Sequence, residues 1–384
     1  MDATEKDVFV GYKSIFRDSK LAFFFWKGRV ALYSILRCIG LRPGDEVIVP
    51  GFTCVVVANA IIYLGAKPIY ADIDPLSYNI NIETVKPLLT SRTRVIVAQN
   101  TFGLSPDLDS LLSLAEDRGL FLVEDCAHGL GGSYKSRPAG TVAHASFFST
   151  QWSKPITTGL GGIAITRDKK LAGNMAEFYK SLAKPSACDK TVLALQLILF
   201  PLINYPNIHY PLIKLYRFLT QKAGLSVGSS SGDELIRPVM PTNYLKKMSP
   251  LQLRLFYKNL EQLEAKVVKR KKAWHLYNKY FNTKTKILLR NGLAGHSMLR
   301  YPLRVRNKNK VLRLAMKYKI PVGEWFISPL HPVRGSLEPW GYKYGMCPQA
   351  EKACAEVINL FTDNVLSRKQ LDILYKIVFD EIVA

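Results

Sequence analysis

Paired cysteines are missing from this chain of 384 residues. Its six cysteines form no CxxC pair and no spacing typical of a metal site; they are Cys38, Cys54, Cys126, Cys188, Cys347 and Cys354. We therefore expect reduced thiols in a reducing compartment and no bound metal. The first residues, MDATEKDVFVGYK, also lack the apolar centre of a signal peptide, so the expected location is the cytoplasm.

An uninterrupted apolar run long enough to cross a membrane is missing as well. Residues 191–213 contain no Lys, Arg, Asp or Glu, but prolines at positions 201, 206 and 211 interrupt them. A spanning helix needs about 20 predominantly apolar residues in a row, so we expect no span. Two interpretations stay open: the stretch packs on the sheet or on a partner subunit, or it dips into a membrane interface.

Acidic residues are scarce between positions 243 and 320, where 21 Lys and Arg side chains stand against only Glu261 and Glu264. Most of the net charge of +23 therefore lies in this basic segment. Such a charge attracts anions, for example nucleotide diphosphates, anionic lipid headgroups or nucleic acid. The segment would also help residues 191–213 to contact the inner face of an anionic membrane. The alternative is the solvated face of long helices.

Short apolar segments alternate with helical patterns of about 10–15 residues in the first part of the chain. The expected strands are residues 46–50, 68–74, 93–100, 120–125, 144–150 and 162–166, and the expected helices are 28–43, 52–65, 85–91 and 107–119. This alternation predicts an α/β fold with a mostly parallel central sheet flanked by helices. In such sheets, ligands bind at the carboxyl ends of the strands.

The pattern after residue 240 predicts a smaller C-terminal α+β domain. A long helix over 248–281 would begin at Ser249 as N-cap with Pro250 in its first turn. A strand at 297–305 and helices at 309–319, 351–361 and 368–383 would follow. We therefore expect two domains, residues 1–240 and 241–384. Residues 191–232 would be an apolar insertion and flexible loop within the first.

Lys154 lies in the segment STQWSKPITTGLGG, between a cluster of hydroxyl side chains and a run of glycines. Asp125 ends the apolar segment LFLVED, 29 residues earlier. A buried lysine loses its proton easily and then attacks an aldehyde. A carboxylate holds a pyridine nitrogen protonated, and hydroxyls and amides hold a phosphate. These residue types are those that a pyridoxal-phosphate enzyme needs.

Several ordered motifs carry a resemblance to a known family. They are GDEVIVPGFT with LGAKPIYADID, EDCAHGLGGSY, FFSTQWSKPITTGLGG, PTNYLKKMSPLQLRL and SPLHP. In this order, over nearly the whole chain, the sequence resembles the DegT/DnrJ/EryC1/StrS family of sugar aminotransferases. The resemblance implies the fold type I architecture of pyridoxal-phosphate transferases, pyridoxal 5′-phosphate as cofactor, and a homodimer with shared active sites.

The resemblance also implies a role for individual residues. Lys154 would form the Schiff base with the cofactor and then move protons. Asp125 would pair with the pyridine nitrogen, and His128 would lie near the ring or its phenolic oxygen. Ser149 and the backbone amides that follow Gly28 would hold the phosphate.

Two further positions depend on how this chain differs from the family, and Asn243 has a role that the family implies directly. The family commonly has Ser-Gly-Thr where this chain has Lys-Gly-Arg, so Arg29 would either bind the phosphate or turn away from it. Cys54 stands where an aromatic ring often stacks on the cofactor, so Phe102 or Trp152 would have to supply that ring. Asn243 would reach the phosphate of the other subunit.

The implied activity is transfer of an amino group from glutamate to a keto group of a nucleotide-linked sugar, in the biosynthesis of a polysaccharide or related amino sugar. His331 would line the sugar pocket, and the basic segment would help to hold the nucleotide diphosphate. One alternative is a dehydratase of the same family, although those relatives carry histidine where Lys154 stands. Another is a non-catalytic regulator that binds nucleic acid, but no recognisable reading motif is present, so we expect no nucleic acid.

Overall fold

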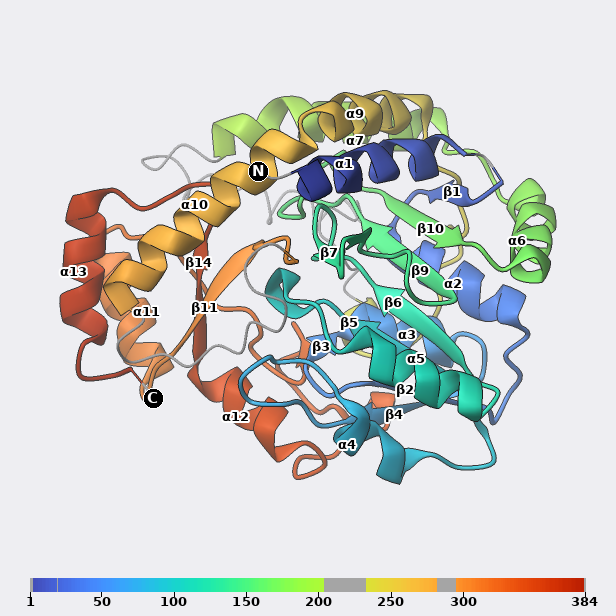
Figure 1. Ribbon diagram of the computed structural model, residues 1–384, viewed down its shortest axis with the longest axis horizontal. Helices are drawn as coiled ribbons and strands as arrows, with labels where there is room; N and C mark the ends of the chain where they lie inside the picture. Colours follow the sequence, from blue (N-terminus) through green and yellow to red (C-terminus); the bar gives the residue numbers. More distant parts are fainter. Residues whose placement is uncertain (1–2, 19, 204–232, 282–294, 383–384) are drawn as a thin grey trace.

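A seven-stranded sheet forms the centre of the computed structural model, which describes residues 3–18, 20–203, 233–281 and 295–382 (Figure 1). The strand order is β1-β10-β9-β6-β5-β2-β4. The bounds are β1 (Ala22–Phe25), β2 (Glu46–Pro50), β4 (Lys67–Ala71), β5 (Thr93–Gln99), β6 (Phe121–Asp125), β9 (Ala145–Ser149) and β10 (Gly162–Thr166). Neighbours from β4 to β9 run parallel, and β10 is antiparallel to both β9 and β1. The predicted α/β class with a mostly parallel sheet is confirmed.

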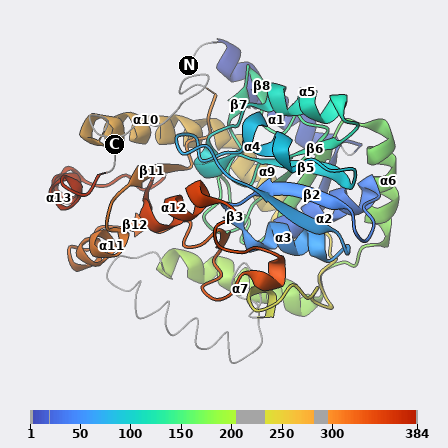
Figure 2. The same ribbon diagram turned by 90° about the horizontal axis from the view of Figure 1, so that it is seen from below.

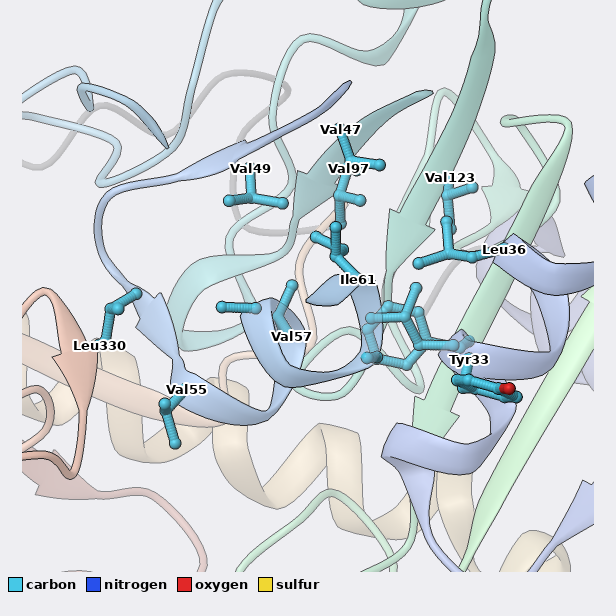
Figure 3. Close-up of a cluster of buried hydrophobic side chains, with 14 of the residues drawn as sticks. Tyr33, Leu36, Val47, Val49, Val55, Val57, Ile61, Val97, Val123 and Leu330 are labelled. Atoms are coloured by element: carbon cyan, nitrogen blue, oxygen red, sulfur yellow. The ribbon is translucent and has the colours of Figure 1, made fainter. Parts of the chain in front are cut away.

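Helices cover both faces of this sheet. Alternate residues of a strand point to opposite faces and pack in different hydrophobic clusters. Val47 and Val97 pack with Leu36 and Ile61, as Figure 3 shows, whereas Ile48 belongs to a cluster on the opposite face. The helices are α1 (Ala3–Arg17), α2 (Gly28–Ile39), α3 (Val55–Ile62), α4 (Ile82–Val85), α5 (Leu108–Asp117), α6 (Lys169–Ser181) and α7 (Ala187–Ile203). Helices α2 and α3 cover one face and α5 covers the other. Strands buried from both sides explain the apolar runs in the sequence.

Two of the expected helices are shorter than their sequence pattern. Helix α2 ends at Ile39 because Gly40 takes a left-handed conformation with a φ of 95°. In the expected helix 52–65, Thr53 and Cys54 instead form strand β3 (Thr53–Cys54), and α3 begins at Val55. Strand β3 pairs in parallel with β13 (Leu330–His331). This pairing brings the late SPLHP motif beside the start of α3.

The expected helix 248–281 is interrupted at Gln262, which leaves the helical region with φ −96° and ψ 1°. The result is α9 (Pro250–Glu261) and α10 (Leu263–Phe281). The predicted start is as observed, because the Ser249 side chain accepts a hydrogen bond from the Gln252 amide. The break lets α9 pack beside α1, while the later part of α10 packs in the core of the C-terminal part.

A three-stranded antiparallel sheet and its helices form the C-terminal part. The sheet has the order β11 (Arg300–Arg304), β14 (Val357–Phe361) and β12 (Val322–Gly323). Figures 1 and 2 show α11 (Lys308–Lys317) and α13 (Arg368–Val378) at one end of the molecule and α6 at the other. The expected domain boundary at 240/241 stays a prediction, and α9, which follows it, packs in one cluster with α1.

The expected helix 351–361 is wrong in its second half. Helix α12 (Pro348–Glu356) ends at Glu356, and residues 357–361 form β14. All five of these residues pair with β11, and the first four are buried. Pairing on both sides and burial on both faces favour a strand for VINLF, whereas an amphipathic helix would leave one face exposed.

Helix α1 and strand β1 were not expected from the sequence pattern. Tyr12 and Phe16 of α1 pack with Phe256 of α9, and β1 extends the sheet by pairing with β10. None of the described helices has the length and apolar content needed to cross a membrane. Residues 204–232, which include most of the apolar insertion and flexible loop expected at 191–232, lie outside the described residues.

Candidate active site

A pocket opens where β6 and β9 end, beside the first turn of α2. Its lining includes Gly28, Arg29, Cys54, Asp125, Ser149 and Lys154. These residues come from α2, β3, β6, β9 and the loop between β9 and β10. Residues spread over more than 120 positions of the sequence are therefore neighbours in space. This edge of the sheet is where ligands are expected in a parallel α/β fold.

Asp125 is the buried carboxylate of this pocket. It ends β6, and its Oδ1 accepts a hydrogen bond of 2.8 Å from the Ala127 amide. Burial raises the pKa of Asp125 from 3.8 to about 6, while the Ala127 hydrogen bond and the Lys154 charge oppose that rise. The carboxyl group is therefore mostly ionised at neutral pH and ready to pair with a cation.

Glu124, the other half of the acidic pair, points to the opposite face of the strand. Its Oε1 accepts from Asn100 Nδ2 at 2.9 Å and its Oε2 accepts from the Gly140 amide at 2.8 Å. Successive side chains of a strand alternate between faces, so only one of the two acids reaches the pocket. Glu124 instead fixes the loops around β6.

Lys154 follows β9 in the loop that leads to β10. Burial lowers the pKa of its amino group, and the negative charges of Cys54 and Asp125 in their ionised forms oppose that change. Its Nζ lies 5.2 Å from the centre of the Trp325 ring. The carbonyl of the next residue, Pro155, accepts a hydrogen bond of 2.5 Å from Arg270 of α10. The loop that carries the lysine is thus tied to the C-terminal part of the chain.

His128 is buried and stacks on Trp325. The two ring planes differ by 1° and their centres lie 5.0 Å apart. Burial lowers the pKa of His128 well below its usual value, with smaller contributions from Lys154 and Arg300, so the ring is neutral. Its Nδ1 has no hydrogen-bond partner among the described residues. A buried nitrogen left without a partner is available to a bound molecule.

The first turn of α2 and Ser149 form a cradle for an anion. Lys27 precedes the helix and gives no side-chain cap, so the first amide groups of α2 have no side-chain acceptor. A Cβ atom at Gly28 would lie 3.0 Å from Ser149 Cβ and 3.2 Å from Ser149 Oγ. Glycine therefore keeps the helix end close to the serine hydroxyl. Free amides at a helix N-terminus favour a phosphate.

Arg29 lines the pocket, but its guanidinium is engaged elsewhere. Its NH1 group donates to Glu234 Oε1 at 2.8 Å in a fully buried ion pair. The charge of this guanidinium is therefore already balanced by a carboxylate. This pairing favours the orientation in which Arg29 does not bind the phosphate, and its contact with a phosphate stays a prediction.

Asn243 and His331 do not line this pocket. Asn243 is exposed and lines a second cavity together with Lys27 and Lys246. Its expected contact with the partner's cofactor stays a prediction. His331 lies edge-on to Phe326 at 5.2 Å, and burial lowers its pKa to about 3.

Phe102 and Trp152 also lie outside the pocket lining. Phe102 is fully buried and packs against Phe52 and Phe326 at ring-centre distances of 6.0 and 6.1 Å. Trp152 lies against the backbone turn at Gly159. The aromatic side chain that approaches Lys154 is Trp325, which the sequence analysis did not single out. The sequence signal that could have identified Trp325 is its position just before the SPLHP motif.

These residues fit a planar, phosphate-bearing cofactor with a basic ring nitrogen. The uncapped turn of α2 and Ser149 provide donors for the phosphate, and Asp125 provides a buried carboxylate for the nitrogen. Lys154 provides an amine of lowered pKa, and His128 provides a ring nitrogen that has no partner within the part of the chain that the structure describes.

Comparisons with known proteins show which family the chain resembles. The profile of the DegT/DnrJ/EryC1/StrS aminotransferase family matches residues 16–193 and 219–378. GDP-perosamine synthase from Escherichia coli O157:H7 is 38% identical over 151 residues, 39% of this chain and 42% of that protein. UDP-2-acetamido-2-deoxy-3-oxo-D-glucuronate aminotransferase from Pseudomonas aeruginosa is 40% identical over 149 residues, 38% of this chain and 41% of that protein. The matched stretch thus spans about two fifths of these relatives.

A solved structure extends the likeness in fold to almost the whole chain. NtdA from Bacillus subtilis with bound cofactor PMP superposes with a TM-score of 0.70 at 19% identity, covering 99% of this chain and 77% of that one. The family profile covers far more than half of the sequence, and the observed fold agrees with it. The chain therefore belongs to the DegT/DnrJ/EryC1/StrS aminotransferase family.

Proposed function

We propose that this chain is a pyridoxal-phosphate-dependent aminotransferase that moves an amino group from glutamate to a keto group of a nucleotide-linked sugar. One observation carries the proposal: the Lys154 amine and the Asp125 carboxylate line one pocket together with the uncapped first turn of α2. The family description supports the reaction class. The names of the two relatives, which contain GDP and UDP, support a nucleotide-linked substrate.

Each part of the cofactor would have its own protein partner. The amides of the first turn of α2, together with Ser149, would hold the phosphate. Asp125 would hold the ring nitrogen in its protonated form, and His128 would lie beside the ring. When bound, pyridoxal phosphate supplies the electron sink that stabilises negative charge on the carbon that carries the amino group.

Lys154 would hold and move the proton. Burial lowers the pKa of its amine, so a larger fraction is neutral at physiological pH than for a lysine in water. A neutral Nζ can take a proton from the substrate carbon and later return it. The stacked rings of Trp325 and His128 lie beside this amine. The presence of Lys154 also argues against the dehydratase alternative, whose relatives carry histidine at this position.

A homodimer with shared sites is part of the proposal. Asn243 is exposed beside the cavity that contains Lys27, and it would reach the phosphate site of the partner subunit. The basic segment 243–320 would attract the nucleotide diphosphate of the sugar substrate. A buried lysine–carboxylate pocket has no use in a non-catalytic nucleic-acid-binding protein, so we do not propose that function.

The position of the reactive lysine gives the most direct test. The protein is incubated with pyridoxal phosphate, reduced with borohydride and digested, and the labelled peptide is identified by mass spectrometry. The same pocket contains Lys27, whose pKa burial lowers to about 8, so the experiment has a real competitor. We expect the label on Lys154 in the wild type and in Lys27→Met, and no label in Lys154→Ala.

Turnover is tested with glutamate and a nucleotide-linked keto-sugar, with 2-oxoglutarate as the measured product. A label on Lys27, or undiminished turnover by Lys154→Ala, would contradict the proposal. Lys27→Met serves as the matched control because it removes a buried amine from the same pocket.

We also propose that the apolar stretch 191–213 contacts an anionic membrane. On α7, Leu195, Ile198 and Leu199 are 54%, 68% and 43% exposed, at spacings that put them on one face of the helix. An exposed apolar face on a basic protein favours contact with anionic lipid. We expect co-sedimentation with phosphatidylserine vesicles at low salt and a loss of binding in Ile198→Asp. Equal co-sedimentation with neutral vesicles, or no co-sedimentation with either kind of vesicle, would contradict the proposed contact.

A further inference from the structure

Arg300 is a buried arginine that has no acidic partner of its own. It is 4% exposed, and no hydrogen bond or ion pair of its guanidinium is present among the described residues. It begins β11, where Tyr301 and Leu303 belong to the cluster that packs on the helices of the C-terminal part. Strand alternation therefore turns Arg300 to the opposite face. Its pKa, lowered by burial to about 10, leaves it charged at neutral pH.

The carboxylate whose charge acts on Arg300 is that of Asp363, and it is already paired with a second buried arginine. Asp363 accepts from Arg270 Nε at 2.8 Å and from its NH2 group at 3.4 Å. The NH1 group of Arg270 has no partner among the described residues, and the residue is 1% exposed. Two buried guanidinium groups thus share a single acid. A buried charge without a counter-charge is unfavourable, and a bound anion would remove that cost.

Arg300 lies close to the residues of the candidate active site. Its Cζ is 4.9 Å from the centre of the Trp325 ring, and the Nζ of Lys154 is 5.2 Å from the same point. The charge of Arg300 lowers the pKa of both Lys154 and His128. The ring of Phe361 lies 4.1 Å from Cζ and fixes the guanidinium against the strand. The amine and the guanidinium therefore both lie next to the ring of Trp325.

We propose that Arg300 binds a substrate carboxylate and so holds the reacting group beside Lys154. This inference rests on the proposed aminotransferase function and adds a residue that would recognise the substrate. A guanidinium and a carboxylate form two parallel hydrogen bonds, and the rings of Trp325 and Phe361 lie next to this guanidinium. The carboxylate has two sources: the amino acid that donates the nitrogen, or a uronic-acid sugar that accepts it. The donor is the favoured source, because every amino acid carries a carboxylate on the carbon that bears the reacting nitrogen.

The test measures binding and does not depend on turnover. Glutarate, a dicarboxylate without an amino group, is titrated by calorimetry into the cofactor-loaded wild type and into Arg300→Met. We expect the variant to bind glutarate about 10- to 100-fold more weakly, the range for a lost charge-assisted pair. Arg300→Lys should recover part of the affinity, because it keeps the charge but loses the bidentate geometry.

Arg304→Met is the matched control. It removes an arginine from the same strand, but this one is already paired with Glu356 at 2.6 Å. We expect its glutarate affinity to equal that of the wild type. The cofactor absorbance and melting temperature of each variant verify folding, and Arg300→Gln replaces Arg300→Met if the latter does not fold.

A second arm identifies the source of the carboxylate. UDP-N-acetylglucosamine and its uronic-acid counterpart are titrated into the same proteins. Weaker binding of glutarate alone assigns Arg300 to the donor, and weaker binding of the uronic sugar alone assigns it to the acceptor. Unchanged affinities for both in Arg300→Met, or no glutarate binding by the wild type, would overturn the inference. Failure of the proposed function itself would be seen separately, as absence of the borohydride label on Lys154.

Discussion

At the scale of single residues, position in a strand decides what an acid does. Glu124 and Asp125 are adjacent and chemically alike, yet one supports loops and the other lines the pocket. Both are buried, and burial raises the pKa of both carboxyl groups. Glu124 has two hydrogen-bond donors, whereas Asp125 keeps one oxygen without a described donor. The pocket therefore contains a carboxylate whose ionised form destabilises the folded protein unless a cation pairs with it.

The first prediction follows from the pKa of Asp125, about 6 in the folded protein against 3.8 as its ordinary value. Because the folded state binds this proton more tightly, the stability from this group is present below about pH 4 and is lost as pH rises through about 6. Asp125→Asn resembles the protonated acid. Without cofactor, the variant should therefore match the wild type near pH 4 and exceed it by about 3 kcal/mol above pH 7.

Urea unfolding at both pH values measures this difference. Ser149→Ala, which removes a neutral group from the same pocket, should show a difference from the wild type that does not change with pH. An Asp125→Asn difference that is equally constant would show that the carboxyl group is not strained by burial.

Lys308 supports the second prediction, because it holds the segment that carries Trp325. Its Nζ donates to the carbonyls of Glu324, Phe326 and Cys354 at 3.1, 3.0 and 2.9 Å. Lys308→Met would leave these carbonyls without their donor, at a cost of about 2–4 kcal/mol in the free energy of unfolding. Lys310→Met, which breaks only a surface ion pair with Glu381, should cost less than about 1 kcal/mol.

Chemical unfolding measures both variants, with tryptophan fluorescence as a local signal. A shift of the native emission in Lys308→Met alone would link the lysine to the position of Trp325. Equal stability of the two variants would contradict the supporting role.

At the scale of elements, the close approach of β10 to α2 shapes the phosphate cradle. A Cβ atom on Gly162 would lie 2.4 Å from both the Cα of Gly28 and the carbonyl oxygen of Lys27. Those are backbone atoms, which cannot rotate away as a side chain would. Gly162 thus allows β10 to approach the start of α2 closely. The glycine is needed here for lack of space and not for backbone flexibility.

The third prediction is that Gly162→Ala shifts α2 away from β10. The overpacking should cost about 1–3 kcal/mol, and the affinity for pyridoxal phosphate should fall because the free amides move. Gly173→Ala is the control, since it lies inside α6 with nothing within 4 Å, and it should stabilise the protein by about 0.5–1 kcal/mol. Thermal unfolding and cofactor titration provide the two measurements. Unchanged cofactor affinity in Gly162→Ala would separate this contact from the phosphate site.

At the scale of the whole molecule, the basic segment 243–320 carries less unpaired positive charge than its sequence suggests. Among the described residues, four of its cations pair with acids from other parts of the chain: Lys246 with Asp189, Arg270 with Asp363, Arg304 with Glu356 and Lys310 with Glu381. Folding therefore neutralises some of the charge of the segment. The remaining positive charge is available to attract anionic substrates.

The fourth prediction concerns the proposed shared site of the homodimer. Lys154→Ala and Asn243→Ala homodimers should each have little activity. After mixed unfolding and refolding, about half of the dimers are heterodimers with one complete site, so about a quarter of the wild-type activity should return. If Asn243 served its own subunit, no dimer would contain a complete site and no activity would return. Sedimentation of the mixture confirms that dimers have formed.

The sequence alone determined the class of the fold and the chemistry of its main residues. Strands such as EVIVP and helices such as 28–39 follow from local apolar periodicity, which a few neighbouring residues decide. Asp125 and Lys154 were identified because their residue types and spacing match one chemistry. Helix starts with strong local signals, such as Ser249 followed by Pro250, were also predictable.

Only the tertiary structure decided which distant groups meet. Arg29 pairs with Glu234, which is 205 positions away, and Trp325 and Arg300 approach Lys154 from the C-terminal part. Residues 357–361 form a strand because β11 offers backbone partners, although the local pattern suits a helix. The physical reason is the same in each case. Local propensity depends on a short window of residues, whereas the partner of a charge, a ring or a backbone amide depends on how remote segments pack.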